Sequence, residues 1–298
     1  MRADASVRLR VTSRKSKLYH TEAIAQRLRE AIERKVGLLR ALSVLGDDET
    51  EEEERGPAQL FVVRAVRDTI VVSADSSGEH LHRRGYRQAV AKAPLRETLA
   101  AAMLLGSGWR GETPLVDPMC GSGTIPIEAA MIARRMAPGR ARAFAFERWP
   151  EIDSASWARL REETRARELT RAGVAIRGSD RDAGAIDAAR SNAERAEVSE
   201  DVEFAVAPLS ATAPDSSWYG GPGAIVTNPP YGIRVGEAGP LRDLYAALGR
   251  ATRDAYRGWR LAVLSPGPEL EAQIALEFEE RFRTTNGGIP VRLVVSEP

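Results

Sequence analysis

One six-residue stretch, Thr227-Asn228-Pro229-Pro230-Tyr231-Gly232, joins an amide, two prolines and an aromatic ring directly after an apolar run. The side-chain oxygen of Asn228 and the carbonyl of Pro229 are hydrogen-bond acceptors, and proline has no N–H that would compete with them. Together they can hold a flat exocyclic amino group, and the ring of Tyr231 offers a stacking face worth roughly 1–3 kcal/mol per base. Alone, Pro229-Pro230 could equally be an ordinary turn.

A second stretch, Asp117-Pro118-Met119-Cys120-Gly121-Ser122-Gly123-Thr124, has the residues of a cofactor loop. Its two glycines allow a tight turn and a close approach to a ligand. Further on, Asp180 ends a predicted strand and can accept hydrogen bonds from ribose hydroxyls. We therefore expect the cofactor contacts at Asp117, Cys120, Gly121, Ser122, Gly123, Thr124, Asp180 and Asn228.

The loop lacks the third glycine and the lysine of phosphate-binding loops, and the charge of Asp117 would repel a pyrophosphate. A cofactor without phosphates fits better, and S-adenosylmethionine is such a cofactor. Asp117 would then face its ammonium or sulfonium group, although a purely structural charge at a helix N-terminus is the alternative. Cys120 is interpreted as a packed thiol and not as a nucleophile.

Basic residues next to aromatic ones suggest a nucleic-acid contact. The cluster His82-Arg83-Arg84-Gly85-Tyr86-Arg87 has this composition, although a solvated linker has it as well. The candidate RNA-binding residues are Lys15, Lys17, Arg83, Arg84, Tyr86, Arg87 and Arg234. Arg234 could also be merely exposed, and the acidic run Asp47–Glu54 is read as a solvated loop and not as a metal site.

Strands and helices alternate regularly in the larger part of the chain, which predicts an α/β fold with a mostly parallel, doubly wound, seven-stranded sheet. The predicted strands are Pro114–Val116, Val174–Arg177, Val202–Val206, Ala224–Val226, Arg260–Leu264, Phe282–Thr284 and Val291–Val295. The predicted helices are Pro94–Leu105, Thr124–Met136, Asp182–Arg195, Pro240–Tyr256 and Glu269–Glu279. Asn228 then lies past a strand's carboxyl end, where open α/β sheets bind ligands.

The first part of the chain predicts a small α+β domain. Its elements are a strand at Val7–Val11, a helix at Thr21–Lys35 and two strands at Leu60–Val66 and Thr69–Ala74. We expect domains at residues 1–80 and 94–298, joined by a linker at 81–93. The long connection Arg140–Gly173 is rich in aromatic residues and contains a charged helix, and we expect it to be an insertion that partly covers the site.

Composition limits the remaining choices. A chain of 298 residues suits two domains, and its 43% hydrophobic residues are enough for a packed interior. Because Lys+Arg 43 nearly balances Asp+Glu 42, an RNA partner must be met by local patches of charge. The single Cys excludes a disulfide framework and a Cys-rich zinc site. We expect no metal, no membrane partner and a cytoplasmic location.

The chain resembles class I methyltransferases, and more narrowly the THUMP-domain RNA guanine-N2 methyltransferases, particularly the bacterial enzymes that act on 23S ribosomal RNA. The resemblance rests on the two motifs above and on His82–Arg87, Ala93–Ala100 and Phe144–Trp149. It implies a THUMP-like RNA-binding domain before about Ser77, without the ferredoxin-like segment that usually precedes it. Where the family has an acid after the third strand of the sheet, this chain has Ala207-Pro208.

The expected reaction is transfer of the cofactor's methyl group to N2 of a flipped guanine, most simply in 23S ribosomal RNA, with tRNA as an alternative. Asn228, Pro229, Pro230 and Tyr231 are the expected catalytic residues. DNA adenine-N6 and protein glutamine methyltransferases share the motif and remain open, as does a catalytically silent RNA-binding protein.

Overall fold

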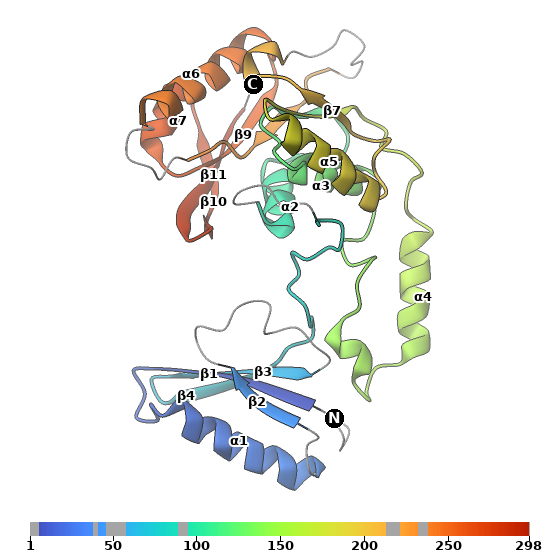
Figure 1. Ribbon diagram of the computed structural model, residues 1–298, viewed down its shortest axis with the longest axis vertical. Coiled ribbons are helices and arrows are strands. Elements are labelled where there is room, and N and C mark those ends of the chain that lie inside the picture. Colours follow the sequence, from blue (N-terminus) through green and yellow to red (C-terminus); the bar gives the residue numbers. More distant parts are fainter. Residues whose placement is uncertain are drawn as a thin grey trace. The chain divides into compact units, whose positions relative to one another are not determined.

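Two units make up the protein, as seen in a computed structural model whose described residues are 6–37, 41–45, 58–88, 95–212, 221–231 and 238–297 (Figure 1). The first unit consists of Met1–Leu81 and Arg142–Glu163. The second consists of His82–Ala141 and Thr164–Pro298. The smaller unit is therefore built from two separate pieces of sequence.

The first unit holds a four-stranded sheet with the order β2-β1-β3-β4. Its elements are β1 (Ser6–Arg14), α1 (Thr21–Val36), β2 (Ala41–Leu45), β3 (Gln59–Val66) and β4 (Thr69–Ala74). β1 pairs in parallel with β2 and β3, and β4 is antiparallel to β3. Val7, Leu9 and Val11 alternate along β1 and pack with Ile24 and Ala25 of α1, as a half-buried strand requires. The sequence prediction missed β2.

Residues 142–163 pack on this first unit. The backbone N–H of Phe146 donates to the carbonyl of Ser76 at 3.1 Å, and the indole of Trp149 donates to Oε1 of Gln59 at 2.7 Å. Phe144 and Phe146 both meet the edge of Trp157. This piece holds the short 3₁₀ helix η1 (Ala145–Arg148) and most of α4 (Ser154–Arg165). Its aromatic residues thus have partners in the small unit, and a role in covering the site stays a prediction.

The second unit holds the seven-stranded sheet, with the order β10-β11-β9-β8-β5-β6-β7. Five strands are parallel, and β11 runs antiparallel to both β9 and β10. The strands are β5 (Leu115–Asp117), β6 (Ile176–Asp180), β7 (Glu203–Val206), β8 (Ala224–Thr227), β9 (Arg260–Ser265), β10 (Glu279–Asn286) and β11 (Ile289–Ser296). The predicted α/β fold with a mostly parallel sheet of seven strands is confirmed.

Helices cover both faces of this sheet, as the alternation of apolar residues requires. Along β9, Ala262 and Leu264 belong to one buried cluster, while Leu261 and Val263 belong to the other. The first cluster is completed by α2 (Glu97–Gly106), α3 (Thr124–Ala133) and α5 (Ala183–Arg195), and the second by α6 (Ala238–Asp254) and α7 (Pro268–Ile274). This arrangement leaves the carboxyl ends of the parallel strands as one common edge.

Some element boundaries differ from the sequence prediction for physical reasons. β6 extends through Gly178, where a Cβ atom would lie 2.7 Å from the ring of Phe204, so the strand needs a glycine despite its low strand propensity. α7 ends at Ile274 because Ala275 adopts the left-handed conformation, with φ of 57°. The following residues from Glu279 join β10, which pairs with β11 and is longer than predicted.

Candidate functional site

The predicted cofactor loop connects β5 to α3, and its two glycines have different structural roles. Gly121 has a φ of 52°, and a Cβ atom built there would meet nothing within 4 Å. Gly123 has a φ of 83°, but a Cβ atom there would lie 2.9 Å from both Ala189 and Phe204. Gly123 therefore permits close helix packing, while Gly121 borders open space that a ligand can enter.

Asp117 ends β5 with a fully buried carboxyl group. Its Oδ1 accepts a hydrogen bond from Oγ1 of Thr227 at 2.8 Å and one from the N–H of Met119 at 3.2 Å. Burial raises the pKa of Asp117 to about 7; the two hydrogen bonds lower it and the charge of Asp180 raises it further. Thr227 ends β8, so the two sequence motifs meet at the edge of the sheet. The role of Thr227 was not anticipated.

Asp180 ends β6 beside the loop. Its Oδ2 accepts from the N–H of Gly121 at 3.0 Å, and its Oδ1 accepts from the N–H of Asp182 at 3.0 Å. Each carboxylate oxygen can accept a further hydrogen bond, so the group can still bind hydroxyls of a ligand. The backbone directly after β7 also lies next to Asp180, because the N–H of Ala207 donates to the carbonyl of Asp180 at 2.9 Å.

Asn228 follows β8 directly and is partly exposed, whereas Pro229 is buried. The hydroxyl of Tyr231 donates to Oδ1 of Asn228. Burial raises the pKa of Tyr231 to about 12, so this hydroxyl keeps its proton at neutral pH. Nδ2 of Asn286, at the end of β10, lies 3.5 Å from the same hydroxyl. Asn286 was not predicted; the Asn286-Gly287 pair only indicates a hairpin turn.

Three of the expected RNA-binding residues, Arg84, Tyr86 and Arg87, have partners inside the second unit. Nε of Arg84 lies 2.9 Å from Oε1 of Glu128, with side chains only 8% and 3% exposed. This is a charge contact without the alignment of a hydrogen bond. Tyr86 is buried and donates to the same carboxylate at 3.1 Å, and Arg87 pairs with Glu97 at 3.4 Å. These side chains are thus paired inside the second unit, and their contact with RNA stays a prediction.

This buried cluster reaches the cofactor loop. Arg87 donates to the hydroxyl of Thr124 at 3.1 Å, at the start of α3. Arg195 donates to the carbonyl of Tyr86 at 2.7 Å and to Oδ1 of Asn192, whose Nδ2 donates to the carbonyl of Ser122 at 3.0 Å. Ser122 and Thr124, two of the residues expected to bind the cofactor, thus accept hydrogen bonds from this cluster. A single acid, Glu128, within the otherwise apolar helix was the available signal for a buried cation nearby.

Other predicted residues fall into three groups. Lys15 and Lys17 are exposed in the first unit, where Asp68 accepts from the N–H of Lys17 at 2.7 Å. Arg83 is half-buried. Arg234, Gly232, Pro94 and the acidic run Asp47–Glu54 lie outside the described residues. Contact with RNA stays a prediction for Lys15, Lys17, Arg83 and Arg234.

Cys120 is buried, and burial raises the pKa of its thiol, with the charges of Asp117 and Asp180 adding to the effect. A protonated thiol is a poor nucleophile. Within the described parts of the chain, no three His, Cys, Asp or Glu side chains form a group that could hold a metal ion. The helices described there also include none that is long and apolar enough to cross a membrane.

Comparisons with known proteins support this assignment of the fold. The chain is 38% identical over 254 residues to the ribosomal RNA large subunit methyltransferase K/L of Marinomonas sp. (strain MWYL1), covering 83% of this chain and 35% of that protein. It is 38% identical over 227 residues to a protein of Synechocystis sp. provisionally named an RNA methyltransferase, covering 76% and 58%. The chain thus spans about a third to three-fifths of the length of these relatives.

Among solved structures, a possible methylase from Clostridium difficile 630 has a TM-score of 0.83 at 32% identity, covering 99% of this chain and 75% of that one. SMU.472, provisionally named a methyltransferase and complexed with SAH, has a TM-score of 0.84 at 28% identity, covering 100% and 76%. The family description "RMKL-like, methyltransferase domain" matches residues 84–294. The chain therefore belongs to the UPF0020 family of RMKL-like methyltransferase domains.

Proposed function

We propose that this protein transfers a methyl group from S-adenosylmethionine to the exocyclic N2 of a guanosine in 23S ribosomal RNA. The observation that carries the proposal is the placement of Asn228 and Pro229 directly after β8, on the edge of the sheet that also carries Asp117 and the open side of Gly121. Acceptors for an amino group and a cofactor loop thus share one edge.

The cofactor is S-adenosylmethionine, as the sequence predicted. The family is a methyltransferase family, and a solved structure with a TM-score of 0.84 is complexed with SAH, the form left after methyl transfer. The residues present fit this group. Asp117 is a buried carboxyl, and none of the ion pairs between described residues involves it, so a ligand ammonium can supply the missing positive charge. Asp180 would accept from the ribose hydroxyls.

When bound, the cofactor supplies an electrophilic methyl group on a sulfonium. The protein's own part is to position the amino nitrogen, whose lone pair would form the new N–C bond as the S–C bond to the methyl group breaks; the nitrogen would then lose one proton to solvent. Oδ1 of Asn228 and the carbonyl of Pro229 would accept hydrogen bonds from the two N–H groups of the amine. These bonds favour a pyramidal nitrogen with a localised lone pair over a planar nitrogen whose lone pair is delocalised into the ring. The hydroxyl of Tyr231 donates to Oδ1 of Asn228. An N–H group of the substrate would replace this hydroxyl as the donor, while the ring of Tyr231 would stay close enough to stack on the base.

The choice of RNA rests on the relatives, one named a ribosomal RNA methyltransferase and one an RNA methyltransferase. A second candidate target is N6 of adenine in DNA, because a solved structure at 29% identity and a TM-score of 0.76 is that of a protein named a predicted N6-adenine-specific DNA methylase from Listeria monocytogenes. Both targets are planar amino groups that the same acceptors would hold. The preceding THUMP-like domain, which favours RNA, is part of the proposal.

The deciding experiment uses labelled S-adenosylmethionine and unmodified 23S ribosomal RNA, made once with guanosine and once with inosine, which lacks only the amino group. We expect methylation of the guanosine RNA alone. Asn228→Ala should lower kcat by roughly 10²–10³ while cofactor affinity stays near that of the wild type. Methylation of the inosine RNA, or near-normal turnover by Asn228→Ala, would exclude an amino-nitrogen target.

A further inference from the structure

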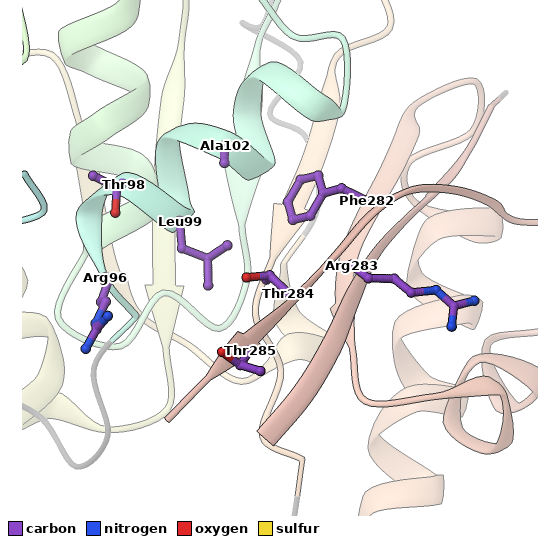
Figure 2. A pocket seen from close by; sticks show the side chains of 8 residues that line it. All are labelled: Arg96, Thr98, Leu99, Ala102, Phe282, Arg283, Thr284 and Thr285. Atoms are coloured by element: carbon purple, nitrogen blue, oxygen red, sulfur yellow. The ribbon is translucent and has the colours of Figure 1, made fainter. Parts of the chain in front are cut away.

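A cavity of about 380 Å³ lies between the first turns of α2 and the strand β10 (Figure 2). Its size is within the range of small-molecule sites, which is roughly 300–1,000 Å³. Leu99 and Ala102 from α2 and Phe282 from β10 form its apolar walls. In Figure 2, Leu99 and Phe282 face the space between helix and strand. Such walls suit a flat, weakly polar group.

The polar residues that line the cavity are three threonines and two arginines. Thr98, Thr284 and Thr285 line it, and Arg96 lies at one end. Arg283 also borders the cavity, but its guanidinium points away from α2 in Figure 2 and is paired with Glu280 at 2.6 Å. Hydroxyls beside apolar walls match a nucleobase with its sugar.

The register of the sheet places this cavity on the catalytic edge. Arg292 of β11 pairs with Ser265, the last residue of β9, and Arg283 of β10 pairs with Arg292. Residues 284–286 therefore extend past the carboxyl end of β9. Thr227, which precedes Asn228, is also at a carboxyl end, pairing with Val263. The tip of β10 and the acceptor motif thus lie at the same edge.

The cavity also lies on the same face of the sheet as the aromatic ring of the motif. Leu99, Phe282 and Tyr231 all pack against the buried cluster on the side of α2 and α3. Asn286, the residue after Thr285, reaches the hydroxyl of Tyr231 at 3.5 Å. The cavity and the acceptor site are therefore neighbours, joined by the end of β10.

The cofactor is an unsuitable occupant. Its expected contacts come from β5 and β6, whereas β8, β9 and β11 separate β10 from β5 in the sheet. At about 4.8 Å per strand, four steps correspond to roughly 19 Å. The substrate side of the sheet, beginning at β8, is the side on which the cavity is found.

From this placement we propose that the cavity between α2 and β10 is an RNA subsite that binds a nucleotide beside the methylated guanosine. Its base lies between Leu99 and Phe282. This inference rests on the proposed function, because it takes the occupant of the neighbouring acceptor site to be a nucleotide of RNA.

The test fills the cavity and measures both RNA binding and methyl transfer. In Ala102→Leu the added side chain occupies the space where the base would lie. We expect the Kd for an unmodified 23S ribosomal RNA transcript, and its KM, to rise about tenfold, with cofactor Kd and kcat unchanged. The matched control is Ala272→Leu on the exposed surface of α7, which should leave all four quantities as in the wild type.

A second variant keeps the test decisive if Ala102→Leu does not fold. Thr284→Leu fills the cavity from β10, where Thr284 is exposed and needs no core repacking. Wild-type RNA affinity in either folded variant overturns the subsite, as does a wild-type protein that does not bind the transcript. If the variants weaken RNA binding but no guanosine is methylated, the subsite stands and the proposed reaction falls. If the guanosine is methylated and the variants bind normally, only the subsite falls.

Discussion

Two carboxyl groups in the second unit, those of Asp117 and Glu128, are buried to a similar degree but have different partners. Both are buried, and burial raises the pKa of each to about 7. Glu128 has Arg84 and Tyr86 beside it, and both lower its pKa. Asp117 has only the hydroxyl of Thr227 and the N–H of Met119 among its hydrogen-bond donors in the described chain.

The difference separates a structural cluster from a candidate binding site. At Glu128 the chain supplies the positive charge itself, and the cluster ties the linker to the helix behind the cofactor loop. At Asp117, next to the open side of Gly121, no ion pair between described residues supplies such a charge. A buried acid without a cation is costly unless a ligand provides the charge. The unpaired acid is therefore the better guide to function.

The largest expected effect is on stability, at the paired acid. Arg84→Ala leaves Glu128 buried without its cation and should lower the free energy of unfolding by about 3–5 kcal/mol. Urea unfolding of the purified protein measures it. Arg250→Ala, at an exposed position of α6, is the control and should change stability by no more than about 0.5 kcal/mol. Equal stability of the two variants would mean that the contact between Arg84 and Glu128 does not stabilise the fold.

Asp180→Ala should come next, with an effect on the cofactor. Removing a charged acceptor for ribose hydroxyls, which also holds the N–H of Gly121, should weaken S-adenosylmethionine binding by about 1.5–3 kcal/mol, or one to two decades. Calorimetry measures the Kd. Asp187→Ala on the outer face of α5 should bind normally. A Kd for Asp180→Ala equal to that of the control would place the ribose elsewhere.

A smaller effect concerns pH at the unpaired acid. Because the raised pKa of Asp117 is about 7, this carboxyl is mostly protonated at pH 6 and ionises as the pH rises. A cationic ligand favours the ionised form, so affinity for S-adenosylmethionine should increase about five- to tenfold between pH 6 and 7.5. Asp117→Asn should bind more weakly with a flat profile over this range. Parallel profiles for both proteins would remove Asp117 from contact with the ammonium.

The smallest effect tests the basic residues that the structure leaves exposed. Lys15→Ala combined with Lys17→Ala should reduce the salt dependence of RNA binding, because each lost phosphate contact removes a slope of about 0.7 in log Kd against log salt for a single strand. Cofactor affinity should stay unchanged. Lys35→Ala, also exposed in the first unit, serves as the comparison. An unaltered slope in the double variant would leave RNA capture to other residues.

Strong periodic patterns explain how much of the fold could be predicted. The seven strands of the larger sheet were each expected from apolar runs next to turn residues, and all are present. β2 was missed because the apolar run around Ala41–Leu45 lacks the alternation of a half-buried strand. α7 was predicted too long because the left-handed backbone at Ala275 has no sequence signal of its own.

The sequence by itself determined which chemistry is available: an amide and a proline carbonyl after an apolar strand, a glycine loop, and acids at two strand ends. These follow from residue type and local spacing, which backbone geometry fixes over short ranges. Only the tertiary structure decided which polar groups are already paired. Arg84 and Asp117 look equally available in the sequence, but long-range packing gives Arg84 a buried carboxylate, whereas among the described residues Asp117 has no cation as a partner. The partners of a buried charge come from distant segments, so no local pattern records them.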